Sequence, residues 1–236
     1  MPVTPTVYPL GDQALTIQFG NAIDPAVNQY CIGLAETIAG MRLPGIRDVI
    51  PSYNTVSMVY DAIAVAAVAG NVSPYEYLQQ KITGWIAGYT PVQAEKRELV
   101  KVPACFDPAV APDLPSLAAS RNISEAEFVE RFTSVTYRVY LLGFIPGFAY
   151  MGKVDEALAL PRKKEPCLVE PGSIGIAGTQ TGIYPLAVPG GWNIIGRTPL
   201  LLFDKKNDPP CFFQPGDEVR FVPVTLHEFH YLNANN

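Results

Sequence analysis

The spacing of apolar positions in the first ninety residues predicts a small sheet covered by helices. Apolar and polar residues alternate in four short runs, as in strands with one buried face. These predicted strands are 7–10, 14–19, 45–53 and 55–60. Apolar residues recur at helical spacing in two longer runs, which follow the capping residues Asp24 and Ser73. The alanine-rich run 62–70 is too short for its periodicity to distinguish a helix from a strand.

This order of elements predicts a ferredoxin-like, split βαβ unit over residues 1–96. A further predicted strand, 99–106, either closes that unit or leads into the next one. The polar run 93–98 is the candidate boundary, because linkers between domains are exposed and polar.

The pattern changes in the second half, where short strands follow one another. Two short helices come first, the second opened by a Ser124–Glu127 capping box. The predicted strands after them are 137–144, 167–169, 173–177, 183–187, 192–195, 200–203 and 219–224. Short strands at close spacing with turn signals are typical of a barrel or sandwich. We therefore predict an α+β protein in which residues 97–236 form a β-barrel domain, with the two helices as its lid or plug.

The stretch from Pro171 to Phe203 has an unusual composition for a set of strands. It contains seven glycines, four prolines and one charged side chain, Arg197. Glycine is favoured where the backbone turns at positive φ or approaches another group closely. Two compatible interpretations are open: a run of tight turns in a small barrel, or a wall that lines a ligand site.

Guanidinium groups, hydrogen-bonding side chains and turn glycines make up the candidate site. The predicted substrate- or nucleotide-binding residues are Arg138, Arg162, Ser173, Gly178, Gln180, Thr181, Tyr184, Gly190, Gly191 and Trp192, with Arg197 as the candidate catalytic residue. A guanidinium suits carboxylate or phosphoryl oxygens, and backbone N–H groups of glycine turns stabilise an oxyanion. The acids Glu165, Glu170 and Asp204 could act as bases or pair with neighbouring basic residues. The arrangement favours binding and polarisation over nucleophilic attack.

Charge and composition argue against several classes of function. The net charge of −5 disfavours a nucleic-acid or anionic-membrane partner. The longest apolar run, 62–69, is too short for a membrane helix and no signal-peptide pattern is present, so we expect a cytoplasmic protein. Four widely spaced cysteines predict reduced thiols. Both histidines, His227 and His230, lie in the last ten residues without an acidic cluster, so we predict no metal site.

Several motifs resemble one known family. They are 142–148 (Leu-Gly-Phe-Ile-Pro-Gly-Phe), 160–162, 171–185, 189–192, 195–199 and 215–221. On these motifs the chain resembles the allophanate hydrolase subunit 1 family, over nearly its whole length and most strongly from 137 to 224. That family includes the B-type component of the bacterial ATP-dependent 5-oxoprolinase and a sporulation kinase inhibitor. One departure is Phe132, which stands where the family leads us to expect a histidine.

The resemblance implies a cyclophilin-like barrel for residues 97–236. It also implies a hetero-oligomer component that is inactive alone and helps to open 5-oxo-L-proline to L-glutamate, with ATP and Mg in the assembled complex. The implied partners are a C-type carboxyltransferase half, an A-type protein of the same complex and a small lactam or amide substrate. Alternatives are an inhibitor of a sensor histidine kinase, or a carboxyltransferase-type lobe that acts on urea or allophanate-like amides.

Overall fold

The computed structural model describes residues 4–89 and 98–235. The chain divides into two compact units, residues 1–96 and 97–236, each described here by itself. Most of the predicted boundary, 93–98, lies outside the described residues.

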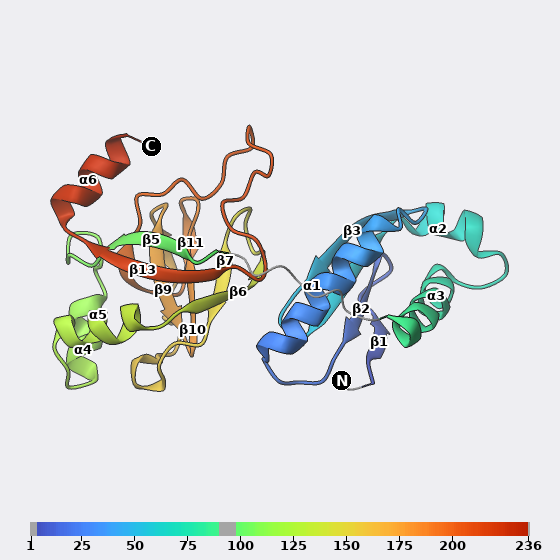
Figure 1. The fold of residues 1–236 in the computed structure, drawn as a ribbon, viewed down its shortest axis with the longest axis horizontal. Helices are drawn as coiled ribbons and strands as arrows, with labels where there is room; N and C mark the ends of the chain where they lie inside the picture. The colour runs from blue at the N-terminus through green and yellow to red at the C-terminus, as the bar shows by residue number, and fades with distance from the viewer. Residues whose placement is uncertain (1–3, 90–97, 236) are drawn as a thin grey trace. The chain divides into compact units, whose positions relative to one another are not determined.

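The first unit is a four-stranded antiparallel sheet packed against helices (Figure 1). Its elements are β1 (Thr6–Pro9), β2 (Ala14–Gln18), α1 (Pro25–Gly40), β3 (Ile46–Pro51), β4 (Thr55–Tyr60), α2 (Ala62–Ala69) and α3 (Pro74–Gly88). The strand order is β1-β2-β4-β3. Buried residues of β2 and β4, such as Leu15 and Met58, pack with Leu34 and Ile38 of α1 in one core.

Side-chain caps explain where these helices begin. The Asp24 carboxylate accepts hydrogen bonds from the N–H groups of Ala26 and Val27, at 2.7 and 3.0 Å. Asp61 caps the alanine-rich segment in the same way, so this ambiguous run is a helix. A capping box of Ser73 and Glu76 starts α3.

The structure decides between the two alternatives left open for the strand at 99–106. The strand at 100–105 does not close the first sheet, because it pairs inside the second unit. The position beside β2 is taken by β1, from the start of the chain. The order β2-α1-β3-β4 is that of a split βαβ unit, but the fourth strand of the sheet comes before this unit in the chain and not after it. The ferredoxin-like assignment stays a prediction.

The second unit contains a closed seven-stranded barrel, as the β-rich pattern predicted (Figure 1). The order around the barrel is β10-β7-β6-β13-β5-β12-β9. Its strands are β5 (Val100–Cys105), β6 (Tyr137–Leu142), β7 (Ala149–Gly152), β9 (Ser173–Ala177), β10 (Gln180–Ile183), β12 (Asn193–Arg197) and β13 (Glu218–Val224). The other elements are α4 (Leu114–Ser120), α5 (Glu125–Ser134), a 3-10 turn (Glu156–Leu158), β8 (Cys167–Val169), β11 (Val188–Gly190) and α6 (Leu226–Ala234). Strands β8 and β11 form a separate antiparallel pair.

The first and last strands of this unit lie side by side and complete the barrel. Strands β5 and β13 are parallel, from Val100 opposite Val219 to Cys105 opposite Val224. Figure 1 shows them as neighbouring green and red arrows. Closure leaves neither strand as a free edge of the barrel.

Helices α4 and α5 share the hydrophobic core of the barrel, as expected for a plug. Phe132 of α5 is fully buried, with ring centroids 5.1 Å from Tyr137 and 5.0 Å from Phe221. The Tyr137 hydroxyl donates a hydrogen bond to the Phe132 carbonyl at 2.8 Å. The position where the family led us to expect a histidine is therefore an apolar core position here.

Several predicted strands of the barrel need correction. The runs 184–187 and 200–203 are not strands. In the second run, only Phe203 makes a β-bridge, with Cys211. Strands β7 and β11 and all of β10 except Ile183 were not predicted, because these segments lie among the glycines and prolines that suggested turns. The last residues form α6, a helix that was not predicted.

Candidate functional site

The sequence-predicted site residues do not form one cluster. Trp192 directly precedes β12 and Arg197 ends it, and the four residue steps from Asn193 to Arg197 span about 13 Å at the rise of a strand. Arg162, Tyr184, Gly190, Gly191 and Trp192 lie around the start of β12, whereas Ser173 lies opposite Arg197 on β9. The two groups are described separately as the Arg162 site and the Arg197 corner.

Hydrogen bonds to three neighbouring segments hold the chain on either side of Arg162. The N–H of Gly178 donates to the Leu160 carbonyl at 2.6 Å, where the β9–β10 hairpin turns. The Asn193 amide donates to the Pro161 carbonyl at 2.9 Å, and the Lys163 N–H donates to the Gly191 carbonyl at 2.8 Å. The backbone that carries Arg162 is therefore fixed by the glycine-rich stretch.

An aromatic floor lies beneath the exposed Arg162 guanidinium. Its central carbon is 5.9 Å from the centroid of the Trp192 ring, which is a cation–π distance. Trp192 packs edge-on against Phe148 and Tyr150, at 5.5 and 5.8 Å. Contact with an aromatic face leaves a guanidinium less hydrated than in bulk water, which favours its binding to a carboxylate or phosphate.

Two tyrosines of this floor are shifted towards their neutral forms. Burial raises the pKa of Tyr184 to about 12, although the Trp192 backbone N–H and the Arg162 charge act in the opposite direction. Burial also raises the pKa of Tyr150, again opposed by Arg162. Both phenols therefore stay protonated at neutral pH and act as hydrogen-bonding groups rather than as bases.

A half-buried ion pair lies next to Arg162 and was missed by the sequence analysis. The Lys163 ammonium is 2.6 Å from the Asp113 carboxylate and 3.7 Å from the Cys167 sulfur. Asp113 precedes α4 but makes no side-chain cap there. Its carboxylate instead accepts the Ile194 N–H at 2.6 Å, which ties α4 to β12.

Three glycines of the candidate stretch make room for aromatic rings. A Cβ on Gly175 would lie 3.0 Å from the Cβ of Trp192. A Cβ on Gly182 would lie 2.9 Å from the Phe148 ring, and one on Gly190 would lie 2.7 Å from the Tyr184 hydroxyl. These glycines thus make room for the aromatic rings that form the floor of the Arg162 site.

A β-bulge places Arg197 on the outer face of the barrel. Ile194 pairs with Gly175, but Gly196 pairs with Ile174, so Ile195 is an extra residue in β12. The alternation of faces is reversed after it, and Arg197 lies opposite Ser173.

The Arg197 corner has internal partners. The Arg197 Nε donates to the Pro171 carbonyl at 2.8 Å, and its guanidinium lies 5.8 Å from the Phe229 ring of α6. An oxygen of Glu170 is 3.9 Å from its Nη2. Glu170, one of the three candidate bases, is thus an ion-pair partner at long distance. The guanidinium connects β12 and the turn before β9 with the C-terminal helix.

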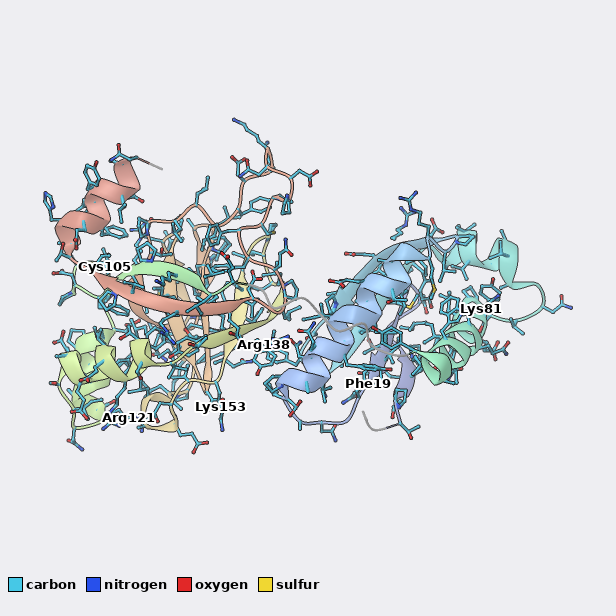
Figure 2. The ribbon with its side chains drawn as sticks, in the orientation of Figure 1. Phe19, Lys81, Cys105, Arg121, Arg138 and Lys153 are labelled. Atoms are coloured by element: carbon cyan, nitrogen blue, oxygen red, sulfur yellow. The ribbon has the colours of Figure 1, made fainter. Side chains whose placement is uncertain are left out.

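The remaining predicted residues have separate environments. The Thr181 hydroxyl is buried and donates to the Gly175 carbonyl at 2.9 Å. Ser173 is also buried; its N–H donates to the Glu170 carbonyl, and its carbonyl accepts the Tyr184 N–H. Gln180 begins β10, opposite Gly152. Arg138 of β6, labelled in Figure 2, lies opposite Gly152 and Glu218 and approaches the Gly216 carbonyl at 3.4 Å.

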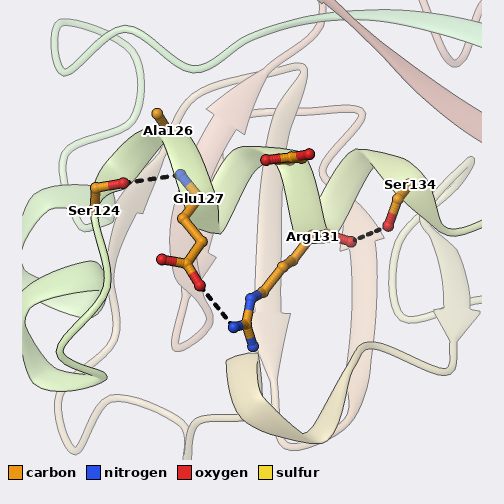
Figure 3. Close-up of a pocket in the computed structure, with 6 residues that line it drawn as sticks. Ser124, Ala126, Glu127, Arg131 and Ser134 are labelled. Carbon is orange, nitrogen blue, oxygen red and sulfur yellow. Dashed lines mark hydrogen bonds and ion pairs between the residues drawn. The ribbon is translucent and has the colours of Figure 1, made fainter.

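A hollow on α5 contains none of the predicted residues (Figure 3). It is lined by Ser124, Ala126, Glu127, Glu130, Arg131 and Ser134. Arg131 pairs with Glu127 at 2.6 Å one turn away, and Ser124 caps the helix by accepting the Glu127 N–H at 3.1 Å. These contacts are those of an exposed helix face.

The residues that the structure describes contain no group of three or more metal-binding side chains. Within the same residues, no helix is both long and apolar enough to cross a bilayer. Both histidines are exposed on α6. The Arg162 site offers a cationic group next to neutral hydrogen-bonding groups, a combination whose chemistry suits an anionic ligand.

Comparison with known proteins gives consistent matches over nearly the whole chain. A family model described as carboxyltransferase domain, subdomain C and D, matches residues 5–213. The 5-oxoprolinase B subunit of Bacillus subtilis is 36% identical over 98% of this chain and 97% of that protein. The 5-oxoprolinase B subunit of Escherichia coli O157:H7 is 36% identical over 92% of this chain and 94% of that protein.

A solved structure extends this comparison to a longer polypeptide. The crystal structure of TTHA0988 matches with a TM-score of 0.74 and 31% identity over 90% of this chain. The match covers 40% of that chain, so the present chain spans about two fifths of the length of TTHA0988. Because the family model matches most of the sequence and the curated relatives match along nearly their full length, the chain belongs to the carboxyltransferase subdomain C and D family.

Proposed function

We propose that this chain is the B-type component of a multi-subunit, ATP-dependent 5-oxoprolinase and helps to open 5-oxo-L-proline to L-glutamate. The observation that carries the proposal is the 36% identity to two 5-oxoprolinase B subunits, over more than nine tenths of each. The partners in this proposal are a C-type carboxyltransferase half and an A-type protein of the same complex.

The Arg162 site suits the first requirement of this reaction, which is to hold a small lactam that carries a carboxylate. In the proposal, the exposed Arg162 guanidinium binds the carboxylate, and the Trp192 ring packs against the guanidinium and helps to orient it. The protonated Tyr150 supplies a neutral hydrogen-bond donor next to this charge. These groups position the substrate, and the proposal assigns no covalent step to them.

ATP and Mg belong to the assembled complex in this proposal. The described residues bring together no group of three or more metal-binding side chains. Mg²⁺ is commonly held by one or two carboxylates together with substrate phosphates. The proposal therefore places the phosphoryl chemistry on the assembled complex and not on this chain alone.

Reconstitution tests the proposal. The chain is mixed with its two partner proteins, and glutamate formed from 5-oxoproline is measured with and without ATP. We expect turnover only in the complete, ATP-containing mixture and none from the chain alone. Equal turnover after omission of this chain would overturn the proposal. Inhibition of sensor-kinase autophosphorylation, or turnover of urea or allophanate without turnover of 5-oxoproline, would support one of the alternative functions instead.

Substitution of Arg162 tests the site within the same assay. We expect Arg162→Gln to lower kcat/KM for 5-oxoproline by at least tenfold, mainly through KM, because a charge-assisted hydrogen bond contributes about 1.5–3 kcal/mol. Lys164→Gln is the matched control, since Lys164 is exposed in the same segment. Equal effects of the two substitutions would remove Arg162 from the site.

A further inference from the structure

Four large apolar side chains are exposed on loops of the second unit. They are Phe144 (63% exposed), Leu201 (58%), Phe212 (46%) and Leu186 (37%). We refer to these four residues as the apolar loop surface. Single exposed apolar residues are common in proteins, but a group of them marks an interaction site.

The loops that carry these residues converge at Gly147. A Cβ on Gly147 would lie 2.9 Å from the Cβ of Phe203, 3.1 Å from the Leu202 carbonyl oxygen and 3.4 Å from the Cβ of Pro185. Gly147 also has a φ of +83°, which favours glycine. Phe144, Leu186 and Leu201 are one to three residues from these contacts in sequence, and the Phe212 N–H donates to the Leu202 carbonyl at 3.0 Å.

Backbone strain at Phe144 is a second, independent observation. Its φ is +70°, a left-handed conformation that costs energy for a residue with a Cβ. Glycine would adopt it without this cost, yet the position carries an exposed aromatic ring that packs edge-on against Phe148 at 5.7 Å. Strain of this kind persists at binding sites, where the side chain it presents is used.

We propose that the apolar loop surface docks the partner chain that corresponds to the remainder of TTHA0988, the part beyond its match to this chain. TTHA0988 carries both parts on one polypeptide, because this chain covers 40% of it. The curated B subunits match over 97% and 94% of their own length, so those chains do not include the remainder, which in this proposal is a separate chain. A contact that is intramolecular in TTHA0988 is intermolecular in such a complex. This inference rests on the proposed function.

The composition of the surface indicates how the partner recognises it. Aromatic anchors in an apolar centre contribute most of the binding energy in protein interfaces. Phe144 and Phe212 are such anchors, and the partner should present an apolar pocket to them. Because none of the four side chains is charged, association depends little on ionic strength.

The test is the dissociation constant for the purified partner chain, measured by calorimetry at low and high salt. Phe144→Gly removes the ring and the strain together, so we expect the dissociation constant to rise at least tenfold while the melting temperature of the free chain stays the same or rises. The double variant Leu201→Ser/Phe212→Ser should weaken binding in the same way. Ile63→Ser is the matched control, because Ile63 is a highly exposed apolar residue of the first unit.

The outcomes separate this inference from the proposed function. Wild-type affinity of both surface variants, in a mixture that turns over 5-oxoproline, would overturn the docking surface alone. A wild-type chain that neither binds the partner nor supports turnover would overturn the proposed function and the docking surface with it. Dimers of the free chain that Phe144→Gly abolishes would assign the surface to a second copy and also overturn the inference.

Discussion

Arg197 lies where three parts of the barrel unit meet. Its side chain bonds to the turn before β9 through Pro171 and contacts α6 through Phe229, while it belongs to β12 itself. We predicted Arg197 as the catalytic residue because it is the one charged side chain between Pro171 and Phe203. The structure supplies that charge with a carbonyl, a ring and a distant carboxylate. These contacts favour a structural role.

We expect Arg197→Met to lower the free energy of unfolding of the second unit by about 2 kcal/mol. The expected loss combines one charge-assisted hydrogen bond and one cation–π contact. Thermal denaturation followed by circular dichroism measures it. The control is Arg220→Met, because Arg220 is exposed and its guanidinium donates to the Thr136 hydroxyl at 2.9 Å. An unchanged melting temperature together with a hundredfold loss of turnover in the complex would restore Arg197 as a catalytic residue.

Tyr184 makes the stability of the barrel unit sensitive to alkaline pH. Its pKa is about 12 in the folded state, against about 10 in an unfolded chain. The folded state therefore holds the proton more tightly, and the stabilisation is complete below pH 10 and is lost as pH rises to 12. We expect a fall of about 2–3 kcal/mol in the free energy of unfolding over this window. Urea denaturation at several pH values should show a smaller slope for Tyr184→Phe, and an identical slope would contradict this account.

At the scale of elements, Gly175 of β9 and Gly182 of β10 leave space in which aromatic rings pack against the backbone. We expect Gly182→Ala to destabilise the barrel unit by about 1–3 kcal/mol, because the new methyl group would overlap the Ala149 carbonyl and the Phe148 ring. The near-ultraviolet circular dichroism of the aromatic cluster should weaken as well. Gly178→Ala is the control, since open space surrounds Gly178 and its positive φ costs only about 1 kcal/mol. A larger loss for Gly178→Ala would show that turn conformation matters more than aromatic packing.

Elements with a local chemical signal could be predicted from the sequence. Helices α1 and α3 follow a capping residue and a proline, and β4, β8 and β9 have the predicted bounds. Strand β7 had no such signal, because it follows the turn at Pro146 and Gly147 and its partners β6 and β10 come from distant parts of the chain. The helix α6 could have been found, since Thr225 and Glu228 form a capping box.

The chemical types in the candidate site could also be predicted, but their grouping could not. Spacing along the chain did not reveal that the bulge at Ile195 places Arg197 on the outer face, about 13 Å along β12 from Asn193. It also did not reveal that Asp113, eighty residues before β12, accepts a hydrogen bond from Ile194 and pairs with Lys163. Both features depend on strand register, which tertiary packing sets.

At the scale of the whole molecule, each unit has its own hydrophobic core. We expect fragments 1–89 and 98–236 to fold when they are expressed separately, because the structure divides into units at 96 and 97. Circular dichroism and cooperative thermal unfolding of each fragment provide the measurement. A fragment 98–236 that stays unfolded would contradict the two-domain interpretation. So would an intact chain that unfolds in a single transition while neither fragment shows cooperative unfolding.

The parallel pairing of β5 with β13 has a consequence during synthesis on the ribosome. The two strands that close the barrel are separated by more than a hundred residues, so the barrel cannot form until the ribosome has synthesised β13 (Glu218–Val224). The strands of the first sheet, in contrast, all lie within residues 6–60 and are available early. The order of translation thus lets the first unit fold while the nascent second unit still exposes its apolar strands, and contacts of such long range form slowly. The nascent second unit is therefore the part of the chain that most needs protection by chaperones.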